Sequence, residues 1–248
     1  MKISVVTVCY NAAGTIADTI ASVQQQDHPD VEHLIIDGAS RDGTQGIVER
    51  MTDARTVFVS EPDGGLYDAM NKGIDRATGD VIGILNADDF FADPGVLSRI
   101  AAAFSEDSAL DAVLGDITFL APRFGLGRRY DSGHFTPHRI GWGWMPAHPG
   151  MYLTREAYEL VGRYSTDYRI AADFEFVVRA FAKHGLRYRH LPDVLVHMRP
   201  GGLSTGGLRA KWTINREMLR ACRAHGVRTS WPMILSKYVH KALEYFRK

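Results

Sequence analysis

Within its first 104 residues the chain alternates four times between a short apolar run and a longer segment with helical spacing. An unbroken run of β-branched and apolar residues is typical of a strand that is covered on both faces. The expected strands are Ile3 to Cys9, Val31 to Ile36, Thr56 to Ser60 and the run that starts at Gly79. Four successive strand–helix units with short connections predict an α/β fold with a doubly wound, mostly parallel sheet.

Polar residues follow each of these strands at the point where the apolar run stops. They are Tyr10 and Asn11, then Asp37, then Glu61 and Asp63, and finally Asn86 to Asp89. The carboxyl ends of parallel strands meet at one edge of a sheet, where open α/β folds bind their ligands. The sequence therefore predicts a polar binding crevice built from four separate elements.

The last of these clusters ends in two adjacent acids, Asp88 and Asp89. Two neighbouring carboxylates repel each other unless a cation neutralises them, and hard oxygen ligands suit Mg²⁺ or Mn²⁺. One hypothesis is a site for a metal ion and a diphosphate. The other is that one of the acids caps the helix that follows Asp93-Pro94-Gly95.

Several classes of protein are disfavoured by composition and by missing motifs. The segment after the first strand lacks the Gly-x-Gly-x-x-Gly pattern of dinucleotide-binding domains, and no P-loop pattern occurs. The formal net charge is zero. No nucleic-acid partner is expected. The two cysteines are far apart, no secretory signal precedes the first strand, and no apolar run approaches the ~20 residues of a membrane span. A cytoplasmic protein is expected.

Four ordered segments resemble the family 2 glycosyltransferases. They are residues 3–11, residues 35–44, residues 60–73 and residues 79–89, and the resemblance extends over roughly residues 3–205. It implies the GT-A fold and is strongest to bacterial enzymes that build lipopolysaccharide, capsule or other cell-surface glycolipid chains. It also implies a nucleotide-sugar donor, with UDP as the expected nucleotide, and a divalent cation, Mn²⁺ or Mg²⁺.

The resemblance assigns roles to the residues at the predicted crevice. Asp37 would accept from the uracil imide, and the backbone around Thr7 and Tyr10 would line the base pocket. The family's Asp-x-Asp motif reads Asn86-Ala87-Asp88 here. Asn86 would therefore contact the ribose, and Asp88 would ligate the metal.

Asn71 and Lys72 belong to a predicted helix that starts at the same edge. Lys72 could meet a phosphate of the donor as a point charge. It could equally belong to a solvated helix face. Both interpretations stay open at the level of sequence.

In the second half of the chain, Asp173 opens a predicted helix. An acid at a helix start is a preferred N-cap, which is the structural interpretation. The resemblance places the catalytic base at this acid, with Glu175 in support. A carboxylate suits that work because the acceptor hydroxyl must lose its proton as it attacks the anomeric carbon.

The expected organisation is a catalytic domain over residues 1–206 and a helical extension over residues 207–248. Within the domain, residues 1–110 would bind the nucleotide sugar and residues 111–206 the acceptor. The glycine-rich stretch from His197 to Gly207 is interpreted as a lid over the diphosphate or as a plain linker.

The extension is basic: residues 201–248 carry a formal charge of +8, against −8 for the rest of the chain. Its final amphipathic helix, residues 231–248, either docks on its own domain or makes a peripheral contact with the inner face of the cell membrane.

The expected function is an inverting, metal-dependent and non-processive transfer of a hexose or N-acetylhexosamine. The donor would be a UDP-sugar, and the acceptor a hydroxyl of a glycolipid, oligosaccharide or polysaccharide precursor. Non-processive transfer is expected because the Gln-x-x-Arg-Trp motif of the family's processive synthases is absent. The alternatives are a sugar-1-phosphate nucleotidyltransferase, which lacks its glycine-rich loop here, and a non-catalytic subunit that binds a nucleotide sugar.

Overall fold

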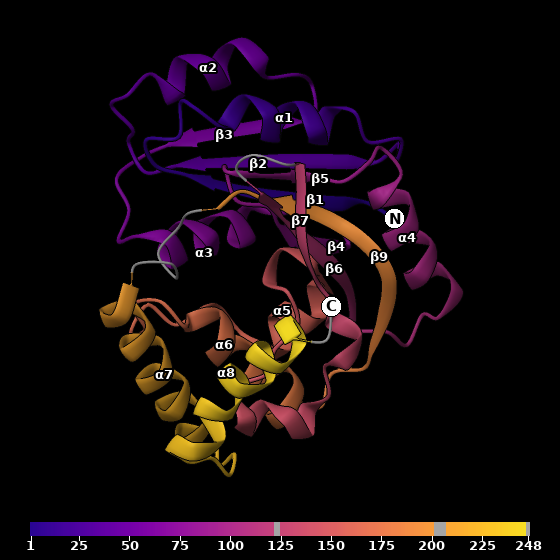
Figure 1. Cartoon of the computed structure of the whole chain (residues 1–248). Helices are drawn as coiled ribbons and strands as arrows, with labels where there is room; N and C mark the ends of the chain where they lie inside the picture. Colours follow the sequence, from indigo (N-terminus) through magenta and orange to yellow (C-terminus); the bar gives the residue numbers. More distant parts are fainter. Residues whose placement is uncertain (122–124, 201–206, 247–248) are drawn as a thin grey trace. The chain divides into compact units, whose positions relative to one another are not determined.

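The computed structural model describes residues 1–121, 125–200 and 207–246, which fall into two compact units (Figure 1). Unit 1 comprises residues 1–133, 146–163 and 186–200. Unit 2 comprises residues 134–145, 164–185 and 201–248. Each unit is built from several segments of the chain. The functional division at residues 110 and 206 stays a prediction.

Unit 1 begins with the four predicted strand–helix units. Parallel strands run in the order β3 (Thr56–Ser60), β2 (Val31–Asp37), β1 (Ile3–Cys9) and β4 (Val81–Ile84). All residues of β1, β2 and β4 are buried, as expected of strands covered on both faces. The predicted strand–helix alternation is thereby confirmed.

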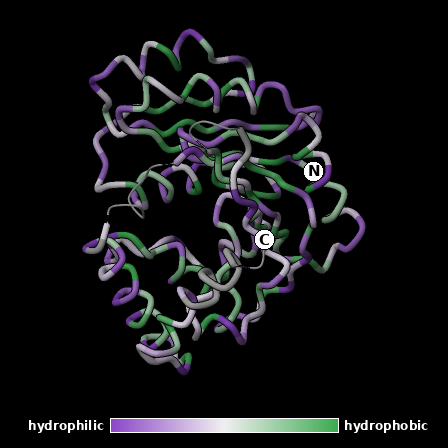
Figure 2. Tube along the Cα trace, viewed as in Figure 1, coloured by the Kyte–Doolittle hydropathy of each residue, from purple (hydrophilic) through white to green (hydrophobic). Residues whose placement is uncertain are grey.

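Each of these strands is followed by an amphipathic helix. The helices are α1 (Ile16–Gln24), α2 (Thr44–Met51), α3 (Leu66–Arg76) and α4 (Val96–Glu106). Hydrophilic and hydrophobic residues alternate along the turns of α1 and α2 (Figure 2), which is typical of helices with one buried face. A Cβ at Gly73 of α3 would overlap the side chain of Val6, so glycine at this position allows α3 to pack directly on β1.

The sheet continues beyond β4 with strands of mixed direction. The order is β8 (Met151–Thr154), β6 (Ala112–Ala121), β9 (Tyr188–Met198) and β5 (Asp89–Phe91), and β7 (Gly125–Tyr130) pairs with β6. β6 and β9 are parallel, whereas β8, β5 and β7 pair with their neighbours in antiparallel fashion. Helix α5 (Arg155–Val161) follows β8. The predicted α/β architecture is confirmed, with a sheet that is parallel in its first half and mixed in its second.

Unit 2 is helical. Its elements are η2 (Pro137–Trp142), α6 (Ala172–Val177), η4 (Val178–Lys183), α7 (Gly207–Ala224) and α8 (Trp231–Phe246). Phe135 packs edge-on against Phe181 with ring centroids 5.2 Å apart. Ala221 and Cys222 of α7 and Ile234 of α8 are fully buried, so the extension packs within this unit. No helix in the described ranges is long and apolar enough to cross a bilayer.

Parts of the expected lid and of the extension are not described. The expected lid, from His197 to Gly207, includes residues 201–206, which lie outside the described residues. The same holds for the side chains of α8 from Val239 onward.

Candidate functional site

Asp37, the residue expected to select the nucleobase, ends β2 and is fully buried. Its Oδ2 accepts from the Ser60 hydroxyl at 2.6 Å and from the Ser40 amide at 3.0 Å, and its Oδ1 accepts from the Ser40 hydroxyl. Its carbonyl accepts from the Glu61 amide at 3.0 Å. Asp37 therefore ties together the ends of β2 and β3. Contact with a base would require one of the serine hydroxyls to turn away, and this role stays a prediction.

Beside Asp37, an exposed aromatic ring faces a glycine. The side chain of Tyr10 is 67% exposed at the end of β1. A Cβ at Gly38 would lie 2.5 Å from Oδ2 of Asp63 and 3.3 Å from the Tyr10 ring. Glycine at position 38 thus lets an aromatic ring and a carboxylate approach from two different loops. A flat apolar ring with an adjacent hydrogen-bond acceptor suits a planar nucleobase.

The backbone around this point is strained. Asn11 and Ala39 have φ values of 51° and 59°, and they are the two non-glycine residues with positive φ in the described part of the chain. Asn11 is held by the hydroxyl of Ser40, which accepts from its amide at 2.7 Å, and by Arg41, whose amide donates to Oδ1 of Asn11 at 3.0 Å. Such conformations persist only where the surroundings enforce them, and they cluster at functional sites.

Thr7 has a structural side chain. It is fully buried, and its Oγ1 lies 2.9 Å from Nε2 of His33. Burial lowers the pKa of His33 to about 3, so this imidazole is neutral. Only the backbone of Thr7 is left for the predicted base pocket, as the sequence interpretation assumed.

The cluster expected to bind a metal lies between β4 and β5. The side-chain amide of Asn86 donates to Oδ2 of Asp89 at 3.3 Å. Within the described residues, Oδ1 of Asn86 and Oδ1 of Asp89 are buried without a hydrogen-bond partner. Burial, together with the charge of Asp88, raises the pKa of Asp89 to about 8. Buried oxygen atoms that lack a donor fit a hard divalent cation.

The competing helix-cap hypothesis is wrong. Helix α4 begins at Val96 with Gly95 as its N-cap, so neither Asp88 nor Asp89 caps it. Asp89 instead begins β5, a strand of three residues that pairs with the end of β9.

At the end of β9, Arg199 reaches this acidic segment. Its Nη1 donates to the carbonyl of Asp88 at 3.3 Å, its guanidinium lies 5.0 Å from the centroid of the Phe90 ring, and it forms an ion pair with Asp18. From the sequence, Arg199 belongs only to the expected lid. The pairing of β5 with β9, which brings Arg199 to this segment, leaves no local pattern in the sequence.

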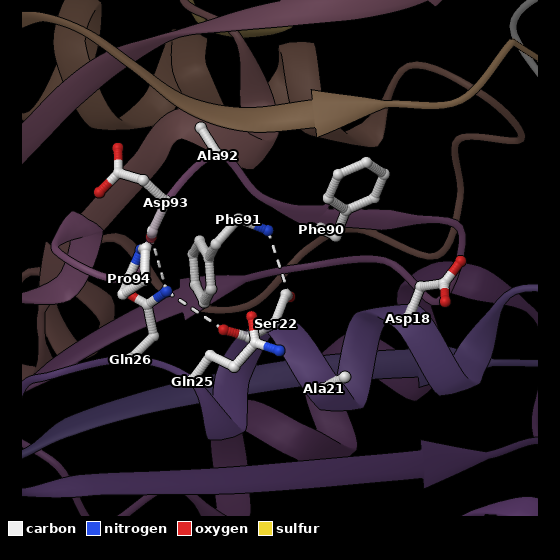
Figure 3. Close-up of a pocket in the computed structure, with 10 residues that line it drawn as sticks. All are labelled: Asp18, Ala21, Ser22, Gln25, Gln26, Phe90, Phe91, Ala92, Asp93 and Pro94. Atoms are coloured by element: carbon white, nitrogen blue, oxygen red, sulfur yellow. Dashed lines mark hydrogen bonds between the residues drawn. The ribbon is translucent and has the colours of Figure 1, made fainter.

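Phe90 also lines a cavity of about 330 Å³. Figure 3 shows Asp18 and Phe90 at one end and Gln26 and Pro94 at the other. Gln26 donates to the carbonyls of Ser22 and Asp93 at 3.1 and 2.9 Å, so its amide group fastens α1 to the segment after β5.

Lys72 is held by acids of its own neighbourhood. Its Nζ lies 3.2 Å from Glu61 and 3.4 Å from Asp68, and it donates to the carbonyl of Pro62 at 2.8 Å. A phosphate would have to compete with these contacts. Asn71 precedes Lys72 on α3, and the donor-binding role of both residues stays a prediction.

A separate cluster with metal-ligand chemistry went unnoticed in the sequence: Asp116, Asp131 and His190, whose ligand atoms lie within 4.8 Å of one another. Oδ1 of Asp116 lies 2.8 Å from Nε2 of His190, and its Oδ2 already pairs with Arg129 at 2.6 Å. The Arg129 guanidinium neutralises the fully buried Asp116. The cluster can therefore connect β6, β7 and β9 without a metal ion. These residues are far apart in sequence, and no motif signals them.

In unit 2, Asp173 lies in the first turn of α6 and is partly exposed. The N-cap of α6 is Ala171, so Asp173 is not the cap that the structural interpretation expected. Burial raises the pKa of Asp173 to about 6, and the charge of Glu217 adds to this effect. A carboxylate with a pKa near neutrality can accept a proton from a hydroxyl in a transition state.

Glu175 is committed to other partners. It is buried, and it accepts from Arg179 at 2.7 and 2.8 Å and lies 2.7 Å from Nε2 of His225. This paired acid supports α6, while Asp173 remains the acid available for chemistry.

Comparison with known proteins places the chain among glycosyltransferases. The model of the family "Glycosyl transferase family 2" matches residues 4–157. The chain is 31% identical over 205 residues to a PGL/p-HBAD biosynthesis glycosyltransferase of Mycobacterium bovis, covering 81% of this chain and 78% of that protein.

Solved structures show the same fold. The crystal structure of S. aureus TarS 1-349 in complex with UDP-GlcNAc matches with a TM-score of 0.73 and 19% identity, over 92% of this chain and 68% of that one. The mannosyltransferase PcManGT from Pyrobaculum calidifontis, in complex with GDP-Man and Mn2+, matches with a TM-score of 0.63 and 20% identity, over 98% and 80%. Against the longer TarS structure, the match covers 39% of that chain. The chain belongs to glycosyl transferase family 2 and is a glycosyltransferase with the GT-A fold.

Proposed function

We propose that this enzyme transfers a hexose or N-acetylhexosamine from a UDP-sugar to a hydroxyl of a glycolipid or polysaccharide precursor of the cell surface. The observation that carries the proposal is a pair of buried oxygen atoms, on Asn86 and Asp89 on either side of Asp88, that have no hydrogen-bond partner among the described residues. A site that holds a sugar diphosphate needs a cation to neutralise the phosphates, and these oxygens fit one. TarS, whose structure contains UDP-GlcNAc, and the curated glycosyltransferase from M. bovis support the donor and acceptor classes.

In this proposal unit 1 holds the donor. Tyr10 and Asp63 flank the nucleobase, Asp37 selects it by accepting from the uracil imide, and Asn86 contacts the ribose. Asp88 would hold a divalent cation, Mn²⁺ or Mg²⁺, with Asn86 and Asp89 close by. When bound, that cation would stabilise the negative charge that develops on the departing diphosphate.

Asp173 would act as the base. A hydroxyl is too weakly acidic to attack unaided at neutral pH, so a carboxylate must accept its proton as the new bond forms. Direct displacement by that hydroxyl at the anomeric carbon inverts its configuration. The transfer of one sugar per encounter is part of the same proposal.

The experiment is a titration of the protein with UDP, with and without Mn²⁺, followed by UDP release from a panel of nucleotide sugars. We expect cation-dependent UDP binding and release from one UDP-hexose or UDP-N-acetylhexosamine. Tight UDP binding without turnover of any nucleotide sugar, in the presence of lipid-linked acceptors, would instead favour the non-catalytic alternative.

We further propose that the enzyme works in the cytoplasm at the inner face of the membrane, through unit 2. Helix α7 exposes a stripe of cationic residues, and Trp212 and Trp231 are 57% and 38% exposed with ring centroids 6.4 Å apart. The stripe consists of Arg209, Arg216, Arg220 and Arg223. Exposed indoles beside guanidinium groups suit an anionic lipid surface.

A further inference from the structure

One carboxylate of α7 accepts three consecutive backbone amides. Oε1 of Glu217 accepts from Arg169 at 2.8 Å, and its Oε2 accepts from Ile170 at 3.0 Å and from Ala171 at 2.9 Å. Successive amides that converge on one anion form a strong and directional contact. The backbone of residues 169–171 is thus fixed by a side chain that lies far away in the sequence.

These three amides immediately precede α6. A helix start leaves backbone N–H groups without partners inside the helix, and Ala171, the N-cap, has no side chain that could accept from them. Glu217 takes over part of this work from another helix. Asp173 follows two residues after the last of the three amides.

The end of α7 makes a second attachment to α6. His225 lies 2.7 Å from Glu175, which also accepts from Arg179. Between the two attachments, the guanidinium of Arg220 lies 4.6 Å from the centroid of the Tyr168 ring. Helix α7 therefore holds both the segment before α6 and α6 itself.

We propose that Glu217 is a positioning residue for proton transfer: it fixes the backbone that carries Asp173 and places a negative charge near that carboxylate. The inference rests on the proposed role of Asp173 as the base. It adds a residue outside the segments that resemble the family, and it gives the basic extension a part in the chemistry.

The surrounding charges single out Glu217. On α6 and η4, Glu175 is neutralised by Arg179, and it also contacts His225. The other charged side chains of η4 and α7 are cationic: Arg179, Lys183, Arg209, Lys211, Arg216, Arg220 and Arg223. The segment before α6 carries one acid, Asp167, and one base, Arg169. Burial raises the pKa of Asp173 to about 6 against the lowering effect of backbone hydrogen bonds, and the charge of Glu217 makes a smaller raising contribution. Removing the charge of Glu217 should therefore lower that pKa.

The test compares Glu217→Gln with Glu217→Asp. Glutamine keeps the length and an acceptor oxygen but removes the charge. We expect the acid limb of the kcat–pH profile to move to lower pH, and kcat at its plateau to fall about 3- to 30-fold because the base is weaker and less well held. Aspartate keeps the charge but is too short to reach the three amides. For this variant we expect a similar loss in kcat with the acid limb nearly unmoved.

The affinity for UDP is the second readout. The residues proposed to hold the nucleotide belong to unit 1, so both variants should keep the parent's dissociation constant for UDP. Glu159→Gln, at an exposed position of α5, is the matched control for the loss of one charge and should leave profile and kcat unchanged. A Glu217→Gln variant that loses thermal stability but keeps the acid limb and kcat would overturn the proposal and leave Glu217 a purely structural cap.

Two further outcomes separate this proposal from the one on which it rests. If Asp173→Asn keeps its turnover, Asp173 is not the base, and the inference about Glu217 falls with it. If Asp173→Asn is inactive but Glu217→Gln matches the parent in kcat and in pH profile, the base stands and only the role of Glu217 is refuted. Should Glu217→Gln not fold, Glu217→Asp decides alone, since unchanged kcat in that variant also refutes the proposal.

Discussion

The side-chain amide of Asn86 donates to Oδ2 of Asp89 at 3.3 Å. Oδ1 of Asn86 and Oδ1 of Asp89 are buried without a hydrogen-bond partner in the described part of the chain. A buried acceptor that receives no hydrogen bond costs about 1–3 kcal/mol. A divalent cation accepts electron pairs from such oxygen atoms, so its binding would remove that cost. The arrangement is the strongest feature in support of a metal at this edge of the sheet.

The first prediction concerns the place of this metal. Asp88→Ala should weaken UDP binding in the presence of Mn²⁺ by about tenfold or more. Substitution of residues that support a metal ligand costs about 10- to 100-fold in metal affinity, and UDP is expected to bind together with the metal. Isothermal titration calorimetry with and without Mn²⁺ measures the effect. Asp131→Asn is the matched control in the second acidic cluster. If that variant lost the metal dependence and Asp88→Ala kept it, the cation would belong with Asp116 and His190.

The second prediction concerns the nucleobase. Asp37→Asn should weaken UDP binding by about 1–3 kcal/mol, because Asp37 is predicted to accept from the uracil imide and a carboxylate is the stronger acceptor. Binding of GDP, measured under the same conditions, should fall less. An equal loss for both nucleotides, together with a lower melting temperature, would point to a folding defect and against base selection.

The third prediction tests the base directly. Asp173→Asn keeps the shape of the side chain but removes its basicity, so turnover should fall by about 10²- to 10⁴-fold with UDP affinity nearly unchanged. In the parent, kcat should decline as the pH falls through about 6, because the carboxyl is then protonated and cannot accept a proton. Turnover that persists in Asp173→Asn would redirect attention to another acid.

The fourth prediction concerns the surface of α7. Replacing Trp212 by Ser and Arg216 by Gln should reduce binding to phosphatidylserine-containing vesicles, and the parent's binding should weaken with added salt. Sedimentation with vesicles at two salt concentrations measures both. Arg50→Gln on α2 removes one exposed charge elsewhere and serves as the control. Truncation at residue 231 is a poor test, because Ile234 of α8 is fully buried.

The fifth prediction is a pH dependence of stability. Burial lowers the pKa of His33 to about 3 and that of His148 to about 4, so both stay neutral in the folded chain over a range where the unfolded chain binds protons. The unfolded state then takes up more protons below about pH 6.5, and stability falls as the pH decreases, by up to about 1.4 kcal/mol per pH unit for each histidine. His33→Gln should show a shallower decline in chemical denaturation between pH 6 and pH 5. A slope equal to that of the parent would contradict the assignment.

The first half of the fold was predictable from the sequence because its signals are local. The strands β1 to β4 are runs of β-branched residues, and the helices between them have regular apolar spacing. The sequence does not predict strands β5 and β7, because Asp89–Phe91 and Gly125–Tyr130 have no strand pattern of their own. They become strands only through pairing with β9 and β6.

The same distinction applies to the site. Asp37 and Asp88 could be named as candidates because each follows a strand that is readable from the sequence, and Asp173 because it opens a predicted helix; their roles come from the resemblance and stay predictions. Their hydrogen-bond partners could not be predicted. Ser60 lies 23 residues from Asp37, and Glu217 lies 46 or more residues from the backbone amides that precede Asp173. Contacts of this kind depend on how the chain returns to itself, which spacing does not encode.

The positive φ angles of Asn11 and Ala39 have a consequence for how a nucleotide would bind. Each costs about 1–2 kcal/mol relative to ordinary backbone, and folding pays that cost before any ligand is present. The loop is therefore already in its final conformation, and a ligand that docks there gives up little conformational entropy. Replacing Ala39 by glycine would relax this strain and make the free enzyme more stable, yet the loosened loop would have to be ordered again with each turnover.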